Sequence, residues 1–485
     1  MKKFICLFLC VFCVNFYVGC KSQKSVLNEY DMSITLNSDM TANCKMNLNY
    51  TNNSKGEIKN LEFMLYANAF SKEAEIKPIY IEYFNTAFDN GVSYGNVIVG
   101  RVISNKTELN FEVLGVQNQV LKVELINPLK QSESAQISID FTLTLPNVNH
   151  RFGYGKNTVN LTGFYPILCP LENGEYYESV YYPSGDPFYS EVANYKVNLT
   201  VPSCFVVASS MSPKSVFVDG ETTTYNYLKN SVRDVAFVLS KNFNVLKKSS
   251  KNCDVYYYYF NDKNAEKTLE TAVKALDYFS SKFLKYPYKE YVFCEADFIY
   301  GGMEYPSLTL IDSSLSGFER DYTVVHETAH QWWYGIVGVN QNENAFIDEG
   351  LTEYSTVTFL NEFSEYNHSK QELLTDVYNA YYEIRKSLVK GENEVPKMNR
   401  NLGEFSSDID YVSIAYYRSQ LMLYELSKFM GEKNFNKFLK NLCAKYAYKN
   451  LTLNNFVLTA EKYKRGAKKF LLSHISGSAV IKPVN

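Results

Sequence analysis

The run YTVVHETAHQWW at 322–333 holds two histidines four positions apart, His326 and His330, and Glu327 directly follows the first of them. The run contains neither glycine nor proline, as expected of a helix. Positions i and i+4 lie on one face of a helix, so both imidazoles can point at a single metal ion. Glu327, about a quarter-turn further on, can then reach a water molecule on that metal rather than the metal itself.

The ends of this helix and its packing can also be predicted. Asp321 is a suitable N-cap, and Gly335 is a suitable stop. Trp332 and Trp333 are the only tryptophans of the chain. They are interpreted as core residues of this helix, because large aromatic side chains mostly serve burial. A place in the substrate wall is the alternative.

A glutamate nineteen positions after the second histidine, Glu349, completes a set of metal ligands. It stands in a second helix-like stretch, 346–360. A catalytic zinc has three protein ligands and one open position, so His326, His330 and Glu349 would bind one Zn²⁺ per chain. Zinc lowers the pKa of its water towards neutrality, and Glu327 can take the proton as attack begins. The pattern predicts a zinc hydrolase; the alternative is a helix with two core histidines and a surface glutamate.

A second motif, YGGMEYP at 300–306, precedes the apolar run LTLI at 308–311. Gly301 and Gly302 ahead of a strand would let another backbone approach closely, as when an extended peptide pairs with an exposed edge. Glu304 beside such an edge could hold a substrate ammonium group by a charge-assisted hydrogen bond. The alternative is a Gly-Gly turn with an exposed glutamate.

Together the two motifs resemble those of the aminopeptidase N-like gluzincins, the family that includes leukotriene hydrolase. The family signature is HExxH, eighteen residues and Glu, preceded by GxMEN. The zinc motif matches in full, and the upstream motif matches at Gly301, Met303 and Glu304. It differs at Tyr305, where most of the family has asparagine. The resemblance implies that Glu304 binds the free α-amino group and that Met303 lines the pocket for the first side chain. It therefore implies a short bacterial zinc aminopeptidase, a metalloprotease that trims peptides from the N-terminus.

The family also carries a tyrosine in a Tyr-x-Lys-Gly segment that hydrogen-bonds the oxyanion of the tetrahedral intermediate. The nearest match is YYRS at 416–419, which assigns that role to Tyr416. A phenol aimed at developing negative charge is a sound donor. Tyr411 and Tyr417 remain alternatives, because Arg and Ser replace the Lys and Gly of the family pattern. Two acidic residues near the third ligand could orient the histidines: Asp348 and Glu353.

The rest of the chain divides by pattern. From 26 to 246, short alternating strands separated by Asn, Gly, Ser and Pro turns predict an all-β, sandwich-like domain. The polar run 247–252 is the expected boundary. From 253 to 469, strands and then amphipathic helices resemble a thermolysin-like zinc peptidase domain, α/β at first and helical afterwards, and 470–485 is a short C-terminal tail. The predicted fold class is α+β.

Two features of the family cannot be transferred to this sequence. Larger members carry a long helical C-terminal domain that partly covers the active site, whereas this chain stops at Asn485. A more open cleft is therefore expected. The second amine-binding residue, which the N-terminal domain supplies, is sought in 163–178, but no motif identifies it.

The N-terminus predicts export. Lys2 and Lys3 precede an apolar run, 4–18, and then Gly19 and Cys20. Fifteen apolar residues are short for a membrane span and suit an export signal over 1–20. A small residue followed by cysteine resembles a bacterial lipobox, so lipid attachment at Cys20 is expected, with ordinary secretion or a retained anchor as alternatives. All three place the mature protein outside the cytoplasm, on the cell surface in the first case.

Cysteine usage and charge exclude two classes of site. Of ten cysteines, four belong to the export segment and six are scattered without a CxxC pair, which excludes a cysteine zinc site and leaves disulfides open. The formal net charge is −3 and no basic run occurs, so nucleic-acid binding is excluded.

Three functions remain to be compared. The leading hypothesis is a zinc aminopeptidase in which Glu327 activates the water, Tyr416 and the metal stabilise the oxyanion, and Glu304 holds the amino group of a peptide with a free N-terminus. A zinc endopeptidase of the same fold would instead cleave N-acetylated peptides. A surface-binding lipoprotein without catalysis is the alternative from a different class.

Overall fold

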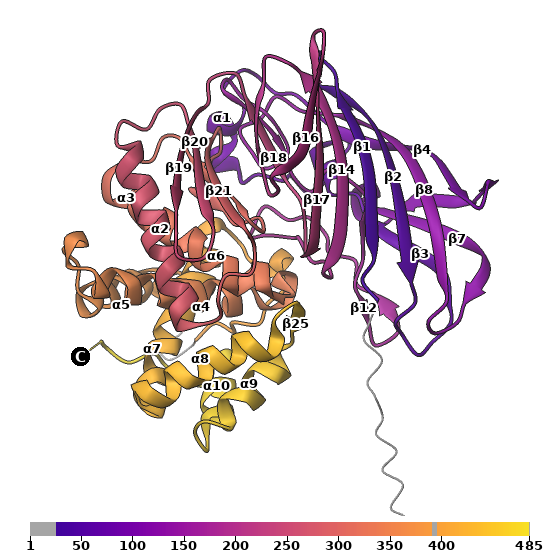
Figure 1. The fold of residues 1–485 in the computed structure, drawn as a ribbon. Coiled ribbons are helices and arrows are strands. Elements are labelled where there is room, and N and C mark those ends of the chain that lie inside the picture. Colours follow the sequence, from indigo (N-terminus) through magenta and orange to yellow (C-terminus); the bar gives the residue numbers. More distant parts are fainter. Residues whose placement is uncertain (1–25, 390–394, 485) are drawn as a thin grey trace, which may run out of the picture.

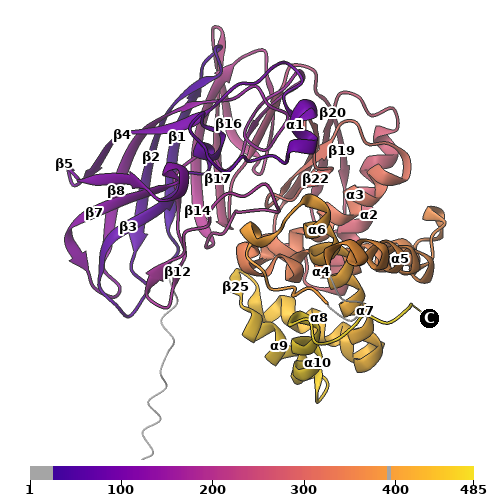
Figure 2. The same cartoon turned by 180° about the vertical axis from the view of Figure 1, so that it is seen from behind.

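A computed structural model describes residues 26–389 and 395–484. A β-rich domain and a mainly helical domain lie side by side, with helices α8–α10 lowest in both views (Figures 1 and 2). The predicted α+β fold class is confirmed. The export signal and Cys20 lie outside the described residues, so export and lipid attachment remain predictions. Within the described ranges, no helix is both long and apolar enough to cross a membrane.

The N-terminal domain is built on an eight-stranded sheet. Its strands alternate between buried and exposed residues, as expected of a sheet with one face on the core. β1 pairs in parallel with β14 and antiparallel with β2. The strands, in sheet order, are β16 (Pro213–Asp219), β17 (Thr222–Val232), β14 (Ala193–Pro202), β1 (Glu29–Leu36), β2 (Thr41–Thr51), β8 (Ser134–Thr144), β4 (Asn96–Ser104) and β5 (Thr107–Glu108).

Two four-stranded sheets complete this domain, and they share a single hydrophobic core with the large sheet. The predicted sandwich-like architecture is thus present. The first small sheet contains β15 (Val206–Ser209), β18 (Phe237–Ser240), β10 (Thr158–Leu161) and β9 (Gly153–Tyr154). The second contains β11 (Ile167–Leu168), β3 (Ile58–Met64), β7 (Val120–Leu129) and β6 (Phe111–Leu114). A short hairpin joins β12 (Leu171–Glu172) to β13 (Glu175–Tyr176).

A five-stranded sheet opens the second domain, and its edge strand β22 carries the Gly-Gly motif. The three middle strands are parallel, and both edge strands are antiparallel to their neighbours. The order is β19 (Asn244–Ser249), β20 (Asp254–Tyr259), β21 (Glu290–Ala296), β23 (Leu308–Asp312) and β22 (Gly302–Met303). The boundary expected in 247–252 falls inside the β19–β20 hairpin, because Lys247 pairs with Tyr256.

A two-stranded parallel sheet of β24 (Val337–Val339) and β25 (Lys449–Leu451) also belongs to this domain. Its helices are α2 (Ala265–Lys282), α3 (Gly317–Ala329), α4 (Gln341–Glu362), α5 (Lys370–Leu388), α6 (Asp408–Val412), α7 (Ser419–Met430), α8 (Glu432–Tyr446), α9 (Leu453–Glu461) and α10 (Ala467–Ile475). Helix α10 runs across the boundary expected at 469/470, and Ile481 beyond it is buried. The segment expected as a short C-terminal tail therefore begins within α10 and buries Ile481.

The helix that carries both histidines begins earlier than predicted. It starts at Gly317 after the N-cap Ser316, so the prediction of Asp321 as N-cap was wrong. Asp321 lies inside the helix because the backbone N–H of Arg320 already donates to the carbonyl oxygen of Ser316, 3.5 Å away. Its carboxylate accepts a hydrogen bond from Nζ of Lys267, 2.9 Å away on α2. The helix ends at Ala329 and gives way to an irregular turn.

Both tryptophans, Trp332 and Trp333, lie in that turn with 0% and 1% exposure. They pack in the core of the second domain, as predicted. The buried Arg233 joins the two domains, since its guanidinium donates to the carbonyl oxygens of Ser190 and Tyr334, each at 3.0 Å. Arg233 therefore links the two domains close to the helix that carries the histidines.

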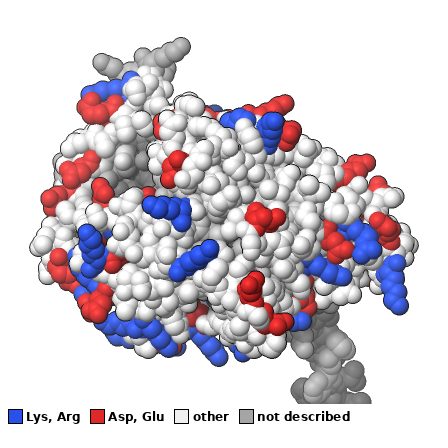
Figure 3. Space-filling model, turned by 90° about the horizontal axis from the view of Figure 1, so that it is seen from above, with Lys and Arg blue, Asp and Glu red and all other residues white. Residues whose placement is uncertain are grey.

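Surface charge and cysteines add two observations. On the face seen from above, acidic and basic side chains are interspersed (Figure 3). The six cysteines in the described ranges are all free thiols, and five of them are buried: Cys44, Cys169, Cys253, Cys294 and Cys443. The sixth, Cys204, is exposed.

Candidate active site

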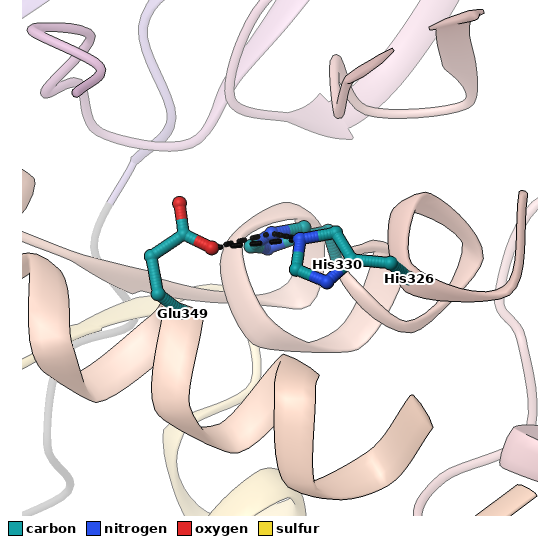
Figure 4. Close-up of side chains that lie close together, drawn as sticks. All are labelled: His326, His330 and Glu349. Carbon is teal, nitrogen blue, oxygen red and sulfur yellow. Dashed lines mark hydrogen bonds and ion pairs between the residues drawn. The ribbon is translucent and has the colours of Figure 1, made fainter. Parts of the chain in front are cut away.

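The three predicted metal ligands converge in the interior (Figure 4). Nε2 of His326 and Nε2 of His330 lie 3.0 Å apart on α3. Oε2 of Glu349, on α4, lies 3.5 Å from the first nitrogen and 3.3 Å from the second. This oxygen is buried and accepts no hydrogen bond from any described residue. Two nitrogens and one oxygen directed at one point fit a zinc ion, which takes such a His₂Glu set at catalytic sites.

Further contacts hold both imidazoles in place. Nδ1 of His326 lies 2.8 Å from Oε1 of Glu353, and Nδ1 of His330 lies 3.0 Å from the carbonyl oxygen of Trp333. Such contacts fix which nitrogen faces a metal. Of the two acidic candidates, Glu353 makes this contact. Asp348 instead accepts a hydrogen bond from the backbone N–H of Glu349, 3.0 Å away.

The predicted base, Glu327, lies next to the ligands and is 5% exposed. Burial raises the pKa of Glu327 to about 8, although the charge of His326 opposes the shift. A pKa near neutrality suits a general base. The carboxylate also lies directly against Gly302 of strand β22, where a Cβ atom would stand 2.4 Å from Oε1 of Glu327. The space beside Gly302 is therefore taken by this side chain, and the predicted approach of a peptide backbone to the Gly-Gly motif stays a prediction.

Replacing Gly302 by alanine is expected to lower kcat by roughly ten- to a hundredfold, because the new methyl group displaces the carboxylate of Glu327 and misplacement of this size has that effect. The measurement is kcat at saturating substrate, with zinc content determined in parallel. Gly56→Ala is the matched control, since a Cβ there has no heavy atom within 4 Å. A kcat for Gly302→Ala within twofold of the native value would contradict the prediction.

Glu304 is buried rather than exposed, at 3% exposure, so the simple-turn alternative is wrong. Its Oε1 accepts a hydrogen bond from Nε2 of Gln341, 3.2 Å away. It lines a cavity of about 410 Å³ together with the predicted ligands, Glu327, Gly301 and Gly302. A carboxylate within this cavity can receive an ammonium group.

The side chains next to Glu304 in the sequence, Met303 and Tyr305, make contacts outside the cavity. Met303 is 1% exposed, and its sulfur lies 3.2 Å from Nε of Arg151 in the N-terminal domain. It is not among the residues lining the cavity. The hydroxyl of Tyr305 lies 2.5 Å from Oγ1 of Thr162. The tyrosine that replaces the family's asparagine therefore points into the contact between the domains.

Tyr416 is the tyrosine that touches the ligand set. It lies in the turn Ser413–Arg418, and its hydroxyl donates to Oε1 of Glu349 at 2.8 Å. Burial raises the pKa of Tyr416, so the phenol keeps its proton and remains a donor. Tyr411 and Tyr417 also line the cavity. Arg418, which stands at the family's lysine position, is buried and donates to the backbone oxygen of His474.

The N-terminal domain supplies a wall of the cavity that the sequence did not reveal. Arg151 and Asp186 line it as a buried ion pair, and the guanidinium of Arg151 also donates to the hydroxyl of Tyr181, 3.2 Å away. Other wall residues come from 183–185. The search region 163–178 contributes none of the cavity's lining residues, which come from positions before it and after it in the N-terminal domain.

Comparison with known protein families finds a match for most of the second domain. Residues 267–475 match the sequence model described as "Peptidase family M1 domain". This part of the chain is similar to family M1 peptidase domains. The predicted resemblance to aminopeptidase N-like gluzincins is thereby confirmed. All three predicted ligands, Glu327 and Tyr416 lie within the matched residues.

Curated relatives match part of the chain. Leucine aminopeptidase 2 of Candida albicans is 28% identical over 196 residues, which cover 37% of this chain and 31% of that protein. Leukotriene A-4 hydrolase of Xenopus laevis is 25% identical over 187 residues, covering 36% and 27%. The chain thus matches about a third or less of these relatives' lengths.

A solved structure matches the whole fold. The M1 zinc metallopeptidase from Deinococcus radiodurans superimposes with a TM-score of 0.69 at 14% identity, covering 95% of this chain and 95% of that one. This likeness extends through the N-terminal β domain as well as the second domain. The two-domain arrangement is therefore one that also occurs in a solved zinc metallopeptidase.

Proposed function

We propose that the protein is a zinc-dependent aminopeptidase. The observation that carries the proposal is the presence of Glu304 in one cavity with Glu327 and the His₂Glu set. His326, His330 and Glu349 would hold one zinc ion. Zinc in such a site makes water acidic enough to react at neutral pH and polarises a substrate carbonyl.

Three side chains would then act on the substrate. The carboxylate of Glu304 accepts hydrogen bonds from the ammonium group of the first residue, which places the first peptide bond in the cavity. Glu327 takes a proton from the attacking water and returns it to the leaving nitrogen. The Tyr416 hydroxyl, now held by Glu349 at 2.8 Å, donates to the carbonyl oxygen as negative charge develops there.

Hydrolysis of a panel of aminoacyl-p-nitroanilides, beside N-acetylated peptide counterparts, tests this function. A zinc chelator is expected to abolish cleavage, and added zinc to restore it. Only substrates with a free amino group should react, and Glu304→Gln should lower kcat/KM for them by roughly ten- to a hundredfold, the strength of a charge-assisted hydrogen bond. Cleavage of the N-acetylated peptides would identify an endopeptidase instead, and no cleavage with zinc bound would favour a binding protein.

The proposed place of action is outside the cytoplasm. The charged and apolar start of the sequence and its Gly19-Cys20 pair support export, followed by lipid attachment at Cys20 or by secretion. Peptides reaching the cell surface would then be the substrates. Membrane fractionation of native protein and Cys20→Ser distinguishes the two fates, and cytoplasmic protein would contradict both.

A further inference from the structure

The backbone that follows the histidine helix is strained at one residue. Tyr334 has a φ of 154° and a ψ of −64°, a conformation that favours glycine and that bulky residues rarely adopt. Trp333 before it is also non-helical, with a φ of −97° and a ψ of 63°. Tyr334 is 2% exposed, so this is an interior turn. Such strain persists only where surrounding contacts hold it, and it concentrates at functional sites.

The peptide bond between Trp333 and Tyr334 makes the contact that orients one proposed zinc ligand. The ψ of Trp333 turns its carbonyl oxygen out of the helical direction, and this oxygen lies 3.0 Å from Nδ1 of His330. A carbonyl oxygen only accepts, so Nδ1 carries the proton and Nε2 is left for a metal ion. The hydroxyl of Thr352, 3.1 Å from Nδ1, both donates and accepts, so it does not select the tautomer.

An arginine of the N-terminal domain holds this strained turn. Nε of Arg233 donates to the carbonyl oxygen of Tyr334 at 3.0 Å. Its Nη1 donates to the carbonyl oxygen of Ser190 in its own domain, at 3.0 Å, and to the side chain of Asn450. Its Nη2 donates to the carbonyl oxygen of Lys449 at 2.5 Å. One guanidinium therefore joins the β domain, the strained turn and strand β25.

The site of Arg233 is shaped to receive it. The side chain is 2% exposed, and a Cβ atom on Gly338 would overlap with its Cζ. Gly338 lies in β24, which follows the turn and pairs with β25. Arg233 forms no ion pair with any described residue, and its partners are carbonyl and amide oxygens. Its contacts therefore fix the backbone on both sides of the guanidinium rather than neutralise an acid.

We propose that Arg233 is a positioning residue for the zinc ligand His330. By holding the carbonyl oxygen of Tyr334, it keeps the preceding peptide bond in the orientation in which Trp333 accepts from Nδ1. Arg233 does not line the active-site cavity, so it acts only through this turn. The inference rests on the proposed zinc site. It makes the affinity for the ion depend on a residue of the other domain.

The test is the apparent Kd for zinc, measured by competition with a chelator. Arg233→Met keeps the length of the side chain but removes every donor. It should raise the Kd about tenfold, the usual scale for losing a contact behind a metal ligand.

Lys229→Met is the matched control. Lys229 is another buried cation of the β domain, 6% exposed on its side chain, which donates to the carbonyl oxygen of Ser210 at 2.6 Å and lies 3.8 Å from Glu290 of the second domain. Replacing it removes a link between the domains that does not touch the strained turn. Its zinc Kd should therefore stay within about twofold of the native value, with folding of each variant checked by circular dichroism.

Two further measurements separate positioning from a loss of stability. Visible absorption of the cobalt-substituted protein reports ligand geometry, and its bands should change in Arg233→Met but not in Lys229→Met. Glycine adopts the backbone angles of residue 334 without strain. When combined with Tyr334→Gly, Arg233→Met should therefore raise the Kd by less than about threefold.

The outcomes distinguish this inference from the site on which it rests. A zinc Kd that Arg233→Met leaves within about twofold, or an equal loss in Arg233→Met and Lys229→Met, would overturn the inference while the aminopeptidase proposal stands. If native protein and His330→Ala bind zinc equally weakly, both are wrong. If Arg233→Met does not fold, Arg233→Lys, which keeps the charge and one donor position, decides by the same comparison.

Discussion

Glu327→Gln is expected to lower kcat by roughly a hundred- to ten-thousandfold, the range that a positioned general base contributes. The amide keeps the shape of the side chain against Gly302 but cannot accept a proton. Because Glu327 is not one of the converging ligands, zinc content should be unchanged. KM should also change little, since the amine-binding carboxylate is intact.

The measurement combines single-substrate kinetics with metal analysis of the same preparation. Glu319→Gln is the matched control, as it makes the same chemical change at an exposed position of the same helix, and it should retain native kcat. Retention of more than a few per cent of native turnover by zinc-loaded Glu327→Gln would show that another group takes the proton.

Removing the hydroxyl of Tyr416 should have the second largest effect. Tyr416→Phe is expected to lower kcat by roughly a hundred- to a thousandfold, the usual loss for one oxyanion donor. The ring contact with His326, with centroids 5.9 Å apart, is kept by phenylalanine, so zinc content and KM should change little. The resting hydrogen bond to Glu349 is lost as well, but the substrate loses a hydrogen bond only in the transition state, which is why the effect belongs to kcat.

Tyr411→Phe and Tyr417→Phe are the natural comparisons, because both rings also line the cavity. Each should lower kcat at least tenfold less than Tyr416→Phe does. A larger loss in either variant would transfer the role of oxyanion donor to that tyrosine. An unchanged kcat in all three would assign the charge stabilisation to the metal alone.

The sequence was sufficient for residues placed by local geometry. His326, Glu327 and His330 depend only on helical periodicity, which acts over one turn. The same periodicity explains why Glu353 rather than Asp348 contacts a histidine. Glu353 follows Glu349 by four residues and shares its face of α4, whereas an adjacent residue points aside.

Residues placed by contacts between distant segments could not be predicted. Tyr83 and Asp408, which line the cavity, are 325 positions apart in the chain, and neither belongs to a motif. Asp186 lines the cavity and forms an ion pair with Arg151. The sequence pattern does not reveal this contact. The partner of Asp321 is likewise supplied by a distant segment, since Lys267 lies on α2.

The departure from the family at Tyr305 shows why a motif fixes some roles and not others. Its hydroxyl forms a hydrogen bond with Thr162 of the β domain. The replacement of asparagine by tyrosine therefore affects how the two domains pack. Glu304, one position earlier, still faces the cavity. The two side chains thus make separate contacts, so one residue can vary while the other keeps its role.

Each of the three converging ligands is already ordered by a second contact: His326 by Glu353, His330 by Trp333 and Glu349 by Tyr416. Fixing such side chains costs conformational entropy whenever it happens. Here that loss occurs when the polypeptide folds, so little of the ion's binding free energy is spent on ordering its ligands. Affinity for the ion is consequently a property of how α3, α4 and the Tyr416 turn pack together, and core substitutions that loosen this packing would weaken it without touching a ligand.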